Sequence, residues 1–295
     1  MAGPAWMVSL HGGHSGEFCE HADGTLGEVI ETAAASGLSI YGVAEHAPRP
    51  DSRFLYASER AKGYDVERLH REFEAYSRQS LKLQRCMSGA LHVLRGFEAE
   101  VVPAASYIES MLSLRSEHDF DFVVGSVHHV CEISIDESPE SHRAAVASCN
   151  GLEAFMERYY RLVEEMIRGL RPEIVAHLDL PKLHAPPAAD LCTPRIRRAA
   201  AAAIEAAKAH DCILDLNTAG WRKGLPDPYP SPWLVRLASE IGVDFCFGDD
   251  SHGPSQVGWG LARARQYLLG HGVDSITALG AGPSGLERRK ISLVT

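Results

Sequence analysis

Residues 6–46 read WMVSLHGGHSGEFCEHADGTLGEVIETAAASGLSIYGVAEH, and this stretch is the starting point for predicting the fold. Two short runs of β-forming residues, 6–10 and 39–44, flank a helix-like segment at 26–36. A strand, a helix and a second strand in this order are typical of a βαβ unit, whose two strands run parallel.

The same alternation continues to the end of the chain. Five more strand-like runs follow, at 93–99, 120–127, 174–177, 212–217 and 243–247. Helix-like segments lie between the strands, at 64–84, 104–117, 151–170, 193–210 and 231–241. A standard TIM barrel has eight such units, so the seven found here predict a distorted (β/α)7 TIM-like barrel of the α/β class. An open doubly wound sheet is the alternative, but its Gly-rich phosphate loop is missing.

The chain has 295 residues, of which 45% are hydrophobic and 23% charged, so it can bury a sizeable core. We find no linker of distinct composition and no short internal repeat. We therefore expect one domain over residues 1–295, with its motifs in 6–258 and a C-terminal helix and tail in 259–295.

Charge and cysteine content exclude several classes of protein. Lys and Arg total 29 against 39 Asp and Glu, and the net charge of -10 argues against nucleic acid as a partner. The 7 cysteines include no CxxC pair, which argues against a disulfide framework or a zinc ribbon and fits a cytoplasmic location. No segment approaches the roughly 18 apolar residues of a membrane helix, so we expect no membrane partner.

Histidines and carboxylates follow each predicted strand. In chain order they are His11, His14 and His21; Glu45 and His46; Glu98; His128 and His129; His177 and Asp179; Asn217; and Asp249, Asp250 and His252. In a parallel barrel these strand ends share one face, so the residues are expected to converge. Such N and O donors suit Zn, Mn or Fe in an open catalytic site.

Each histidine taken alone has a simpler interpretation as a hydrogen-bonded core or surface residue. Their recurrence at the same place on several strands makes independent structural roles a poorer explanation. Charged groups gathered in a barrel mouth also need metal ions or mutual pairing.

Six ordered segments resemble the motifs of the polymerase-and-histidinol-phosphatase (PHP) superfamily, and most closely its histidinol-phosphatase branch. They are HGGHSGEFCEHADGTLGEVIETAAASGLSIYGVAEHAPRP, GFEAEVV, DFVVGSVHHV, VAHLDLPK, LDLNTAGWRKGLPDPYPSP and FGDDSHGPSQVG. The resemblance extends to about Gly258. It implies a distorted (β/α)7 barrel with two or three divalent transition-metal ions, Zn, Mn or Fe, at the C-terminal face.

The metal ligands implied by the resemblance are His11, His21, His46, Glu98, His128, His177, Asp250 and His252. The family usually opens with H-x-H, whereas this chain has His11-Gly12-Gly13-His14. Residues i and i+3 of a regular strand point to opposite faces, so both histidines can bind metal only if a glycine permits a bulge. We expect both to be ligands.

Four neighbours have open roles. Glu45 is expected to orient a ligand or to lie just outside the ligand set. His129 either supports the site or lies on the surface. Asp249 is a polar neighbour of the cluster or, in the interpretation we favour, an incidental acid. Cys19 is expected to be a small buried residue and not a nucleophile.

Metal ions lower the pKa of bound water toward ~7, and the resulting hydroxide can attack a phosphate ester. Asp250 and His252 are the candidate catalytic acids. The candidate substrate-binding residues are Asn217, Arg222 and Lys223, because the resemblance implies a basic pair after the sixth strand.

Other cations are weaker candidates for contact with substrate. Arg49 and Arg53 follow the second strand. The basic runs at 195–198 and 288–290 are expected to be solvated helix or tail surface, because neither follows a strand end.

The leading hypothesis is a metal-dependent phosphomonoesterase that resembles L-histidinol-phosphate phosphatase and acts on a small-molecule phosphate ester. One alternative is a PHP hydrolase for another small phosphate or phosphonate ester or a nucleotide. A second is a non-catalytic metal-binding domain. The sequence leaves the native metal, the substrate and the oligomeric state open.

Overall fold

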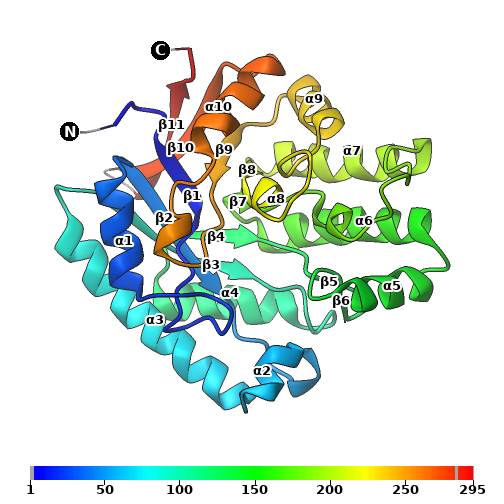
Figure 1. Ribbon diagram of the computed structural model, residues 1–295, viewed down its shortest axis with the longest axis horizontal. Coiled ribbons are helices and arrows are strands. Elements are labelled where there is room, and N and C mark those ends of the chain that lie inside the picture. Colours follow the sequence, from blue (N-terminus) through cyan, green and yellow to red (C-terminus); the bar gives the residue numbers. More distant parts are fainter. Residues whose placement is uncertain (1–2, 283–284, 295) are drawn as a thin grey trace.

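The computed structural model describes residues 3–282 and 285–294, which form a nearly closed barrel of seven parallel strands (Figure 1). Around the barrel these are β1 (Val8–Gly12), β2 (Ile40–His46), β3 (His92–Ala99), β4 (Phe122–Gly125), β7 (Ile174–Val175), β8 (Ile213–Asn217) and β9 (Phe245–Gly248). The Asp250 amide, just after β9, donates to the His11 carbonyl of β1 at 2.8 Å. The predicted distorted barrel is confirmed, and the open sheet is wrong because the first and last strands are neighbours.

Six helices on the outside of the barrel match the predicted segments (Figure 1). They are α1 (Leu26–Ala35), α3 (Val66–Met87), α4 (Tyr107–His118), α6 (Leu152–Leu170), α7 (Pro194–Ala209) and α9 (Pro232–Ile241). Local signals begin several of them: Thr25 and Glu28 form a capping box at α1, and the Thr193 side chain accepts from the Ile196 amide at α7. The buried residues of these helices and of the outer faces of the strands form one apolar core.

The barrel interior is a small apolar core below the polar mouth. Its buried residues are Leu10, Ala44, Leu94, Phe122, Val124, Ile174, Ala176, Ile213, Cys246 and Leu279. Phe122 fills the space that Gly96 leaves on the neighbouring strand, since a Cβ there would lie 2.6 Å from the ring. This packing makes the barrel a filled core and leaves only its upper end for chemistry.

The C-terminal tail contains a β-hairpin that the sequence analysis did not predict. The predicted helix is α10 (Leu261–Gly270), and strands β10 (Ser275–Gly282) and β11 (Gly285–Ser292) follow it. Leu279 of β10 packs into the barrel core. Residues 288–290 are exposed as expected but belong to β11, and residues 195, 197 and 198 are exposed on α7.

Further elements connect the barrel units. They are α2 (Ala57–Ala61), α5 (Pro139–Ser148), α8 (Ala219–Arg222), the 3-10 turns η1 (Ser52–Phe54), η2 (Leu180–Leu183) and η3 (Pro254–Gln256), and the hairpin of β5 (His129–Val130) and β6 (Ile133–Ser134). Among the described residues no helix is long and apolar enough to span a membrane.

Candidate metal centre

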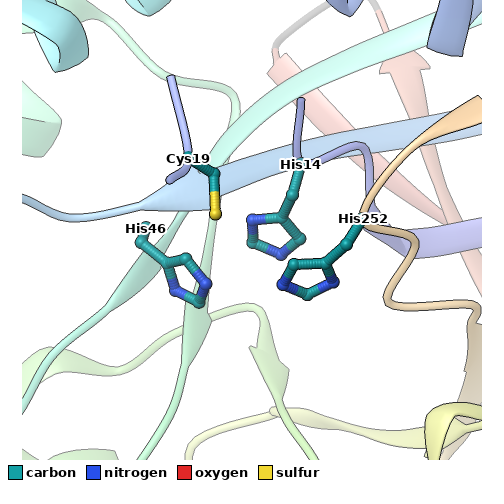
Figure 2. A group of neighbouring side chains, drawn as sticks. All are labelled: His14, Cys19, His46 and His252. Atoms are coloured by element: carbon teal, nitrogen blue, oxygen red, sulfur yellow. The ribbon is translucent and has the colours of Figure 1, made fainter. Parts of the chain in front are cut away.

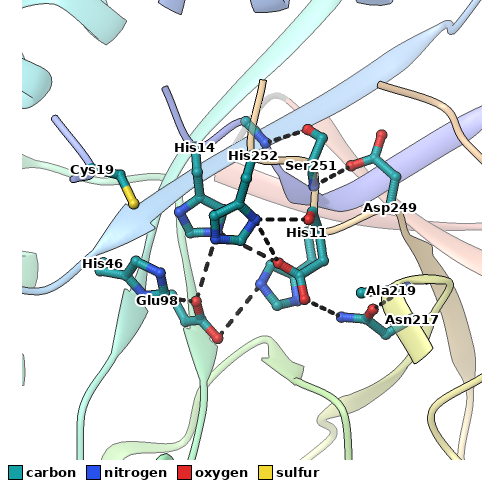
Figure 3. A network of polar contacts seen from close by, with 12 residues as sticks. His11, His14, Cys19, His46, Glu98, Asn217, Ala219, Asp249, Ser251 and His252 are labelled. Atoms are coloured by element: carbon teal, nitrogen blue, oxygen red, sulfur yellow. Dashed lines mark hydrogen bonds and ion pairs between the residues drawn. The ribbon is translucent and has the colours of Figure 1, made fainter. Parts of the chain in front are cut away.

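Glu98, near the end of β3, lies at the centre of the barrel mouth and is 1% exposed. Five histidines from the ends of four other strands, β1, β2, β4 and β7, surround its carboxylate, and Figure 3 shows His11, His14 and His46 beside it. The nitrogen-to-oxygen distances are 3.0 Å for His46, 3.0 Å for His177, 3.4 Å for His128, 3.6 Å for His11 and 3.7 Å for His14. The barrel has therefore brought together residues that lie far apart in the sequence.

A β-bulge in β1 places both His11 and His14 in this cluster. Ser9 pairs with Tyr41, whereas Gly12 pairs with Val43, so β1 holds one extra residue against β2. Gly13 has a φ of 81°, a conformation that glycine adopts without strain. Both histidines are fully buried. The bulge needed for two inward histidines in the HGGH motif is confirmed.

The cluster contains buried nitrogen atoms that have no hydrogen-bond partner. Among the described side chains these include Nε2 of His11, of His14 and of His46. A buried polar atom without a partner is costly, and a metal ion would provide one. Three groups bring their donor atoms within 4.8 Å of one another: His11, His14 and Glu98; Glu98, His128 and His177; and His14, Cys19, His46 and His252. The residues therefore fit more than one divalent metal ion.

Carboxylates hold the other ring nitrogen of three of these histidines. Nδ1 of His11 lies 2.8 Å from Asp215, that of His14 lies 3.0 Å from Glu45, and that of His128 lies 3.1 Å from Glu100. A carboxylate that accepts from one nitrogen leaves the other free to face a metal ion.

Two of these three carboxylates were missed by the sequence analysis. The signal was present, since Asp215 and Glu100 lie two residues from Asn217 and Glu98, and residues two apart on a strand share a face. The expected orienting role of Glu45 agrees with its contact to His14.

The charges of the cluster are unusual for a buried site. Burial alone would raise the pKa of Glu98, but the positive charges of His11, His128 and His46 outweigh it and hold the pKa well below its usual value. Burial, with a further contribution from His14, lowers the pKa of His252 well below its usual value. The ionised Glu98 and the neutral His252 are therefore in the protonation states that bind metals.

A cavity of about 430 Å³ opens above the cluster. Its lining includes His21, His46, Glu98, His128, His177, Arg222, Lys223, Asp250 and His252. His21 is exposed at the rim, where its ring stacks on that of His252 with centroids 4.8 Å apart. A small anionic molecule entering here would meet both the cluster and the basic pair Arg222 and Lys223.

The candidate substrate-binding residues differ in their surroundings. Lys223 is exposed in the cavity. Arg222 donates to the backbone oxygens of Asp249 at 2.8 Å and Asp250 at 2.5 Å, so it also braces that loop. Asn217 is fully buried and does not line the cavity; its amide donates to Asp215 and Asp250 at 3.0 and 3.1 Å. It is placed to position these carboxylates.

The structure also shows the surroundings of Asp249, His129 and Asp179, which follow strand ends but are not among the expected ligands. Asp249 is not an incidental acid: it is fully buried, accepts from the Gly258 amide at 2.7 Å, and burial raises its pKa to about 6. His129 is buried, 3.5 Å from Glu100. Asp179 accepts from the Ser231 amide at 3.0 Å and is outside the cluster.

The two weaker cationic candidates do not line the cavity. The buried Arg49 is paired with Glu59. The exposed Arg53 pairs with Asp51 and Glu132 at 3.2 and 3.0 Å.

A family model for the PHP domain matches residues 11–219. The chain belongs to the PHP domain family. This PHP protein is 33% identical over 282 residues to a "Probable histidinol-phosphatase" of Schizosaccharomyces pombe, covering 94% of this chain and 91% of the relative. It is 28% identical over 293 residues to the histidinol-phosphatase of Saccharomyces cerevisiae, covering 88% and 87% of the two chains.

A solved structure shares the fold of this PHP protein. It is histidinol phosphate phosphatase from Lactococcus lactis, complexed with Zn, L-histidinol and phosphate. The TM-score is 0.69 and the sequence identity 15%, over 96% of this chain and 99% of the other. At this identity the likeness concerns the fold alone.

Proposed function

We propose that this PHP protein is a metal-dependent phosphoric monoester hydrolase that releases phosphate from L-histidinol phosphate. The observation that carries the proposal is the buried Glu98 ringed by five histidines at the base of a cavity that also holds Lys223. Similarity to histidinol-phosphatases over most of the chain supports the choice of substrate.

The proposed metal ligands are the nine residues of the sequence prediction: His11, His14, His21, His46, Glu98, His128, His177, Asp250 and His252. We propose two or three divalent ions, with zinc favoured because the Lactococcus lactis structure is a zinc complex. When bound, such ions neutralise phosphate charge and lower the pKa of coordinated water.

Other side chains would bind the phosphate and move the proton. Lys223 brings an ammonium group to the cavity, and Arg222 holds the backbone of Asp249 and Asp250 in place. Asp250 and His252 line the same cavity and are the proposed catalytic residues, which would take a proton from the attacking water and return it to the leaving alcohol oxygen. Asn217, bonded to Asp250, would keep that carboxylate oriented.

The substrate is tested by measuring inorganic phosphate release from L-histidinol phosphate and from a panel of other phosphomonoesters, phosphonate esters and nucleotides. We expect the highest kcat/KM with L-histidinol phosphate and loss of turnover after chelation. Much faster turnover of another ester would support the proposed phosphatase activity but contradict the assignment of L-histidinol phosphate as the substrate. Bound metal without hydrolysis of any ester would favour the non-catalytic alternative.

The ligand set is tested with His46→Ala and Asp250→Ala. Both variants are expected to lose activity and bound metal, measured by elemental analysis. His70→Ala is the matched control, since His70 is exposed on α3. Unchanged metal content with lost activity would assign His46 and Asp250 to the chemical step alone.

We also propose a cytoplasmic location and no nucleic-acid partner. All 7 cysteines have free thiols, which fits a reducing compartment. The net charge of -10 disfavours binding to a phosphate backbone.

A further inference from the structure

The thiol of Cys19 lies among the histidines of the metal centre. Its sulfur is within 4.8 Å of a ring nitrogen of each of His14, His46 and His252, and Figure 2 shows it pointing toward the rings of His14 and His46. Cys19 is 6% exposed. The sequence analysis predicted its burial but assigned it no contact with the metal centre.

The local backbone directs this thiol inward. Residues 15–19 form a tight turn in which the amide of Cys19 donates to the carbonyl of Ser15 at 2.9 Å. That turn follows directly from the β1 bulge that positions His14. Cys19 and His14 therefore approach the site from the same short segment.

The backbone amide of His21 hydrogen-bonds to the Cys19 sulfur, but the contacts of the sulfur with the His21 ring lack the alignment of a good hydrogen bond. The sulfur lies 3.4 Å from Nδ1 and 3.5 Å from Nε2 of His21. The lone-pair directions of the two nitrogens of one imidazole diverge, so a sulfur equidistant from both lies on the axis of neither. The thiol is close to several nitrogens but well aligned with neither ring nitrogen of His21.

The neighbouring imidazoles present unsatisfied nitrogens. Nε2 of the fully buried His14 and Nε2 of His46 have no hydrogen-bond partner. By contrast, Cys246 packs among aliphatic side chains in the barrel core. Within the described part of the chain, Cys19 is the cysteine that belongs to a group of potential metal donors.

We propose that Cys19 is a direct thiolate ligand of one metal ion of the centre, which it shares with His46 and His252. The proposal rests on the metal centre of the proposed function and adds a sulfur donor to its nitrogen and oxygen donors. When the sulfur–metal bond forms, the thiol proton passes to solvent and a sulfur lone pair is donated to the ion. No oxidation or reduction takes place.

The distances suit this role. Zinc bonds of about 2.3 Å to sulfur and about 2.0–2.1 Å to nitrogen place two donors of one tetrahedral ion about 3.5 Å apart. Donors within 4.8 Å of one another need only small side-chain movements to reach that separation. Thiolate is a soft ligand, so this position should select Zn or Co over Mn.

The test uses Co(II), whose thiolate bond gives a near-ultraviolet charge-transfer band that imidazole and carboxylate ligands do not produce. The full-length protein is stripped of metal, loaded with Co(II), and compared with Cys19→Ser and Cys86→Ser. Cys86 is exposed on α3 and is the matched control. We expect the band in wild type and Cys86→Ser, and its loss in Cys19→Ser.

Metal competition supplies a second measurement. Loss of a group that only supports a ligand typically weakens metal affinity roughly 10–100-fold, so loss of a direct donor should cost at least tenfold. Cys19→Ser is expected to lose zinc affinity to this extent at one site while its manganese affinity changes less. Circular dichroism checks that the variant is folded.

The outcomes separate the two proposals. Bound Co(II) with visible d–d bands but no charge-transfer band in wild type would overturn the role of Cys19 and leave the metal centre standing. That measurement needs no variant, so misfolding of Cys19→Ser cannot obscure it. Absence of bound metal in wild type would overturn both. A band that persists in folded Cys19→Ser would also overturn the thiolate assignment.

Discussion

Gly13 is the residue on which the arrangement of the first motif depends. It has a φ of 81°, and a Cβ at this position would lie 2.7 Å from Cγ1 of Val43. A side chain at this position would therefore cause both backbone strain and a steric clash with Val43. Any other residue would push the segment carrying His14 away from β2.

Gly13→Ala is expected to destabilise the protein and lower its metal content. The positive φ costs about 1–2 kcal/mol and the crowding about 1–3 kcal/mol more. Gly89→Ala is the control, because Gly89 has a φ of 103° but no atom within 4 Å of its Cβ position. Urea unfolding should show a smaller decrease in the free energy of unfolding for Gly89→Ala than for Gly13→Ala. Equal decreases in the two variants would contradict the crowding argument.

Lys223 and Arg222 are adjacent but are expected to behave differently. Lys223→Ala should weaken kcat/KM by roughly 1.5–3 kcal/mol, the contribution of a charge-assisted hydrogen bond, with no change in Tm. Arg222→Ala should lower kcat/KM and also Tm, because its guanidinium braces the backbone of Asp249 and Asp250. Wild-type kinetics in Lys223→Ala would make that side chain ordinary loop surface.

At the scale of elements, the C-terminal hairpin closes the end of the barrel opposite the metal centre. Leu279 of β10 enters the apolar interior, while Lys290 of β11 pairs with Asp244 at 2.5 Å beside the start of β9. Thr277 of β10 donates to the same carboxylate at 2.7 Å. One acid thus ties both strands of the hairpin to the barrel.

Asp244→Asn is expected to reduce stability in a pH-dependent way. Burial would raise the pKa of Asp244, but bonds from Lys290 and Thr277 outweigh it and lower the pKa. A lowered pKa stabilises the fold above the unfolded value of about 3.9, and this stabilisation is lost as the pH falls through the folded pKa. The difference in free energy of unfolding between wild type and Asp244→Asn, measured with urea, should become smaller below about pH 4. A difference that does not change with pH would contradict the ion-pair argument.

At the scale of the whole molecule, the metal centre joins strand ends from all around the barrel. The ligands proposed for it lie at or just after the ends of β1, β2, β3, β4, β7 and β9. A cation bound there would link most of the barrel and offset the charge of the buried Glu98. Metal binding should therefore contribute to the stability of the whole fold.

Removal of metal is expected to lower Tm, and added zinc should restore it. A ligand present at a hundredfold excess over its Kd stabilises the folded state by about 2.7 kcal/mol. The Tm of His46→Ala should change less on addition of chelator or zinc than the Tm of wild type does. An identical Tm with and without chelator in wild type would indicate that the folded protein binds no metal at this centre.

The sequence by itself determined the seven strands of the barrel, six of the helices outside it and the polar residues at the strand ends. These features depend on local spacing of apolar residues, on caps such as Thr25, and on which residues follow each run. Because parallel strands in a barrel end on the same face, the convergence on Glu98 could be predicted without coordinates.

Only the tertiary structure decided which neighbours support the centre. Asp215 and Glu100 are recognised by their contacts with His11 and His128, Asp249 by its burial, and Cys19 by the rings around it. The hairpin that closes the barrel likewise depends on Leu279 reaching strands distant in sequence. Such contacts arise from packing between remote segments. The two-residue spacing of Asp215 and Glu100 from strand-end residues indicates which face they share, but not which histidine each of them contacts.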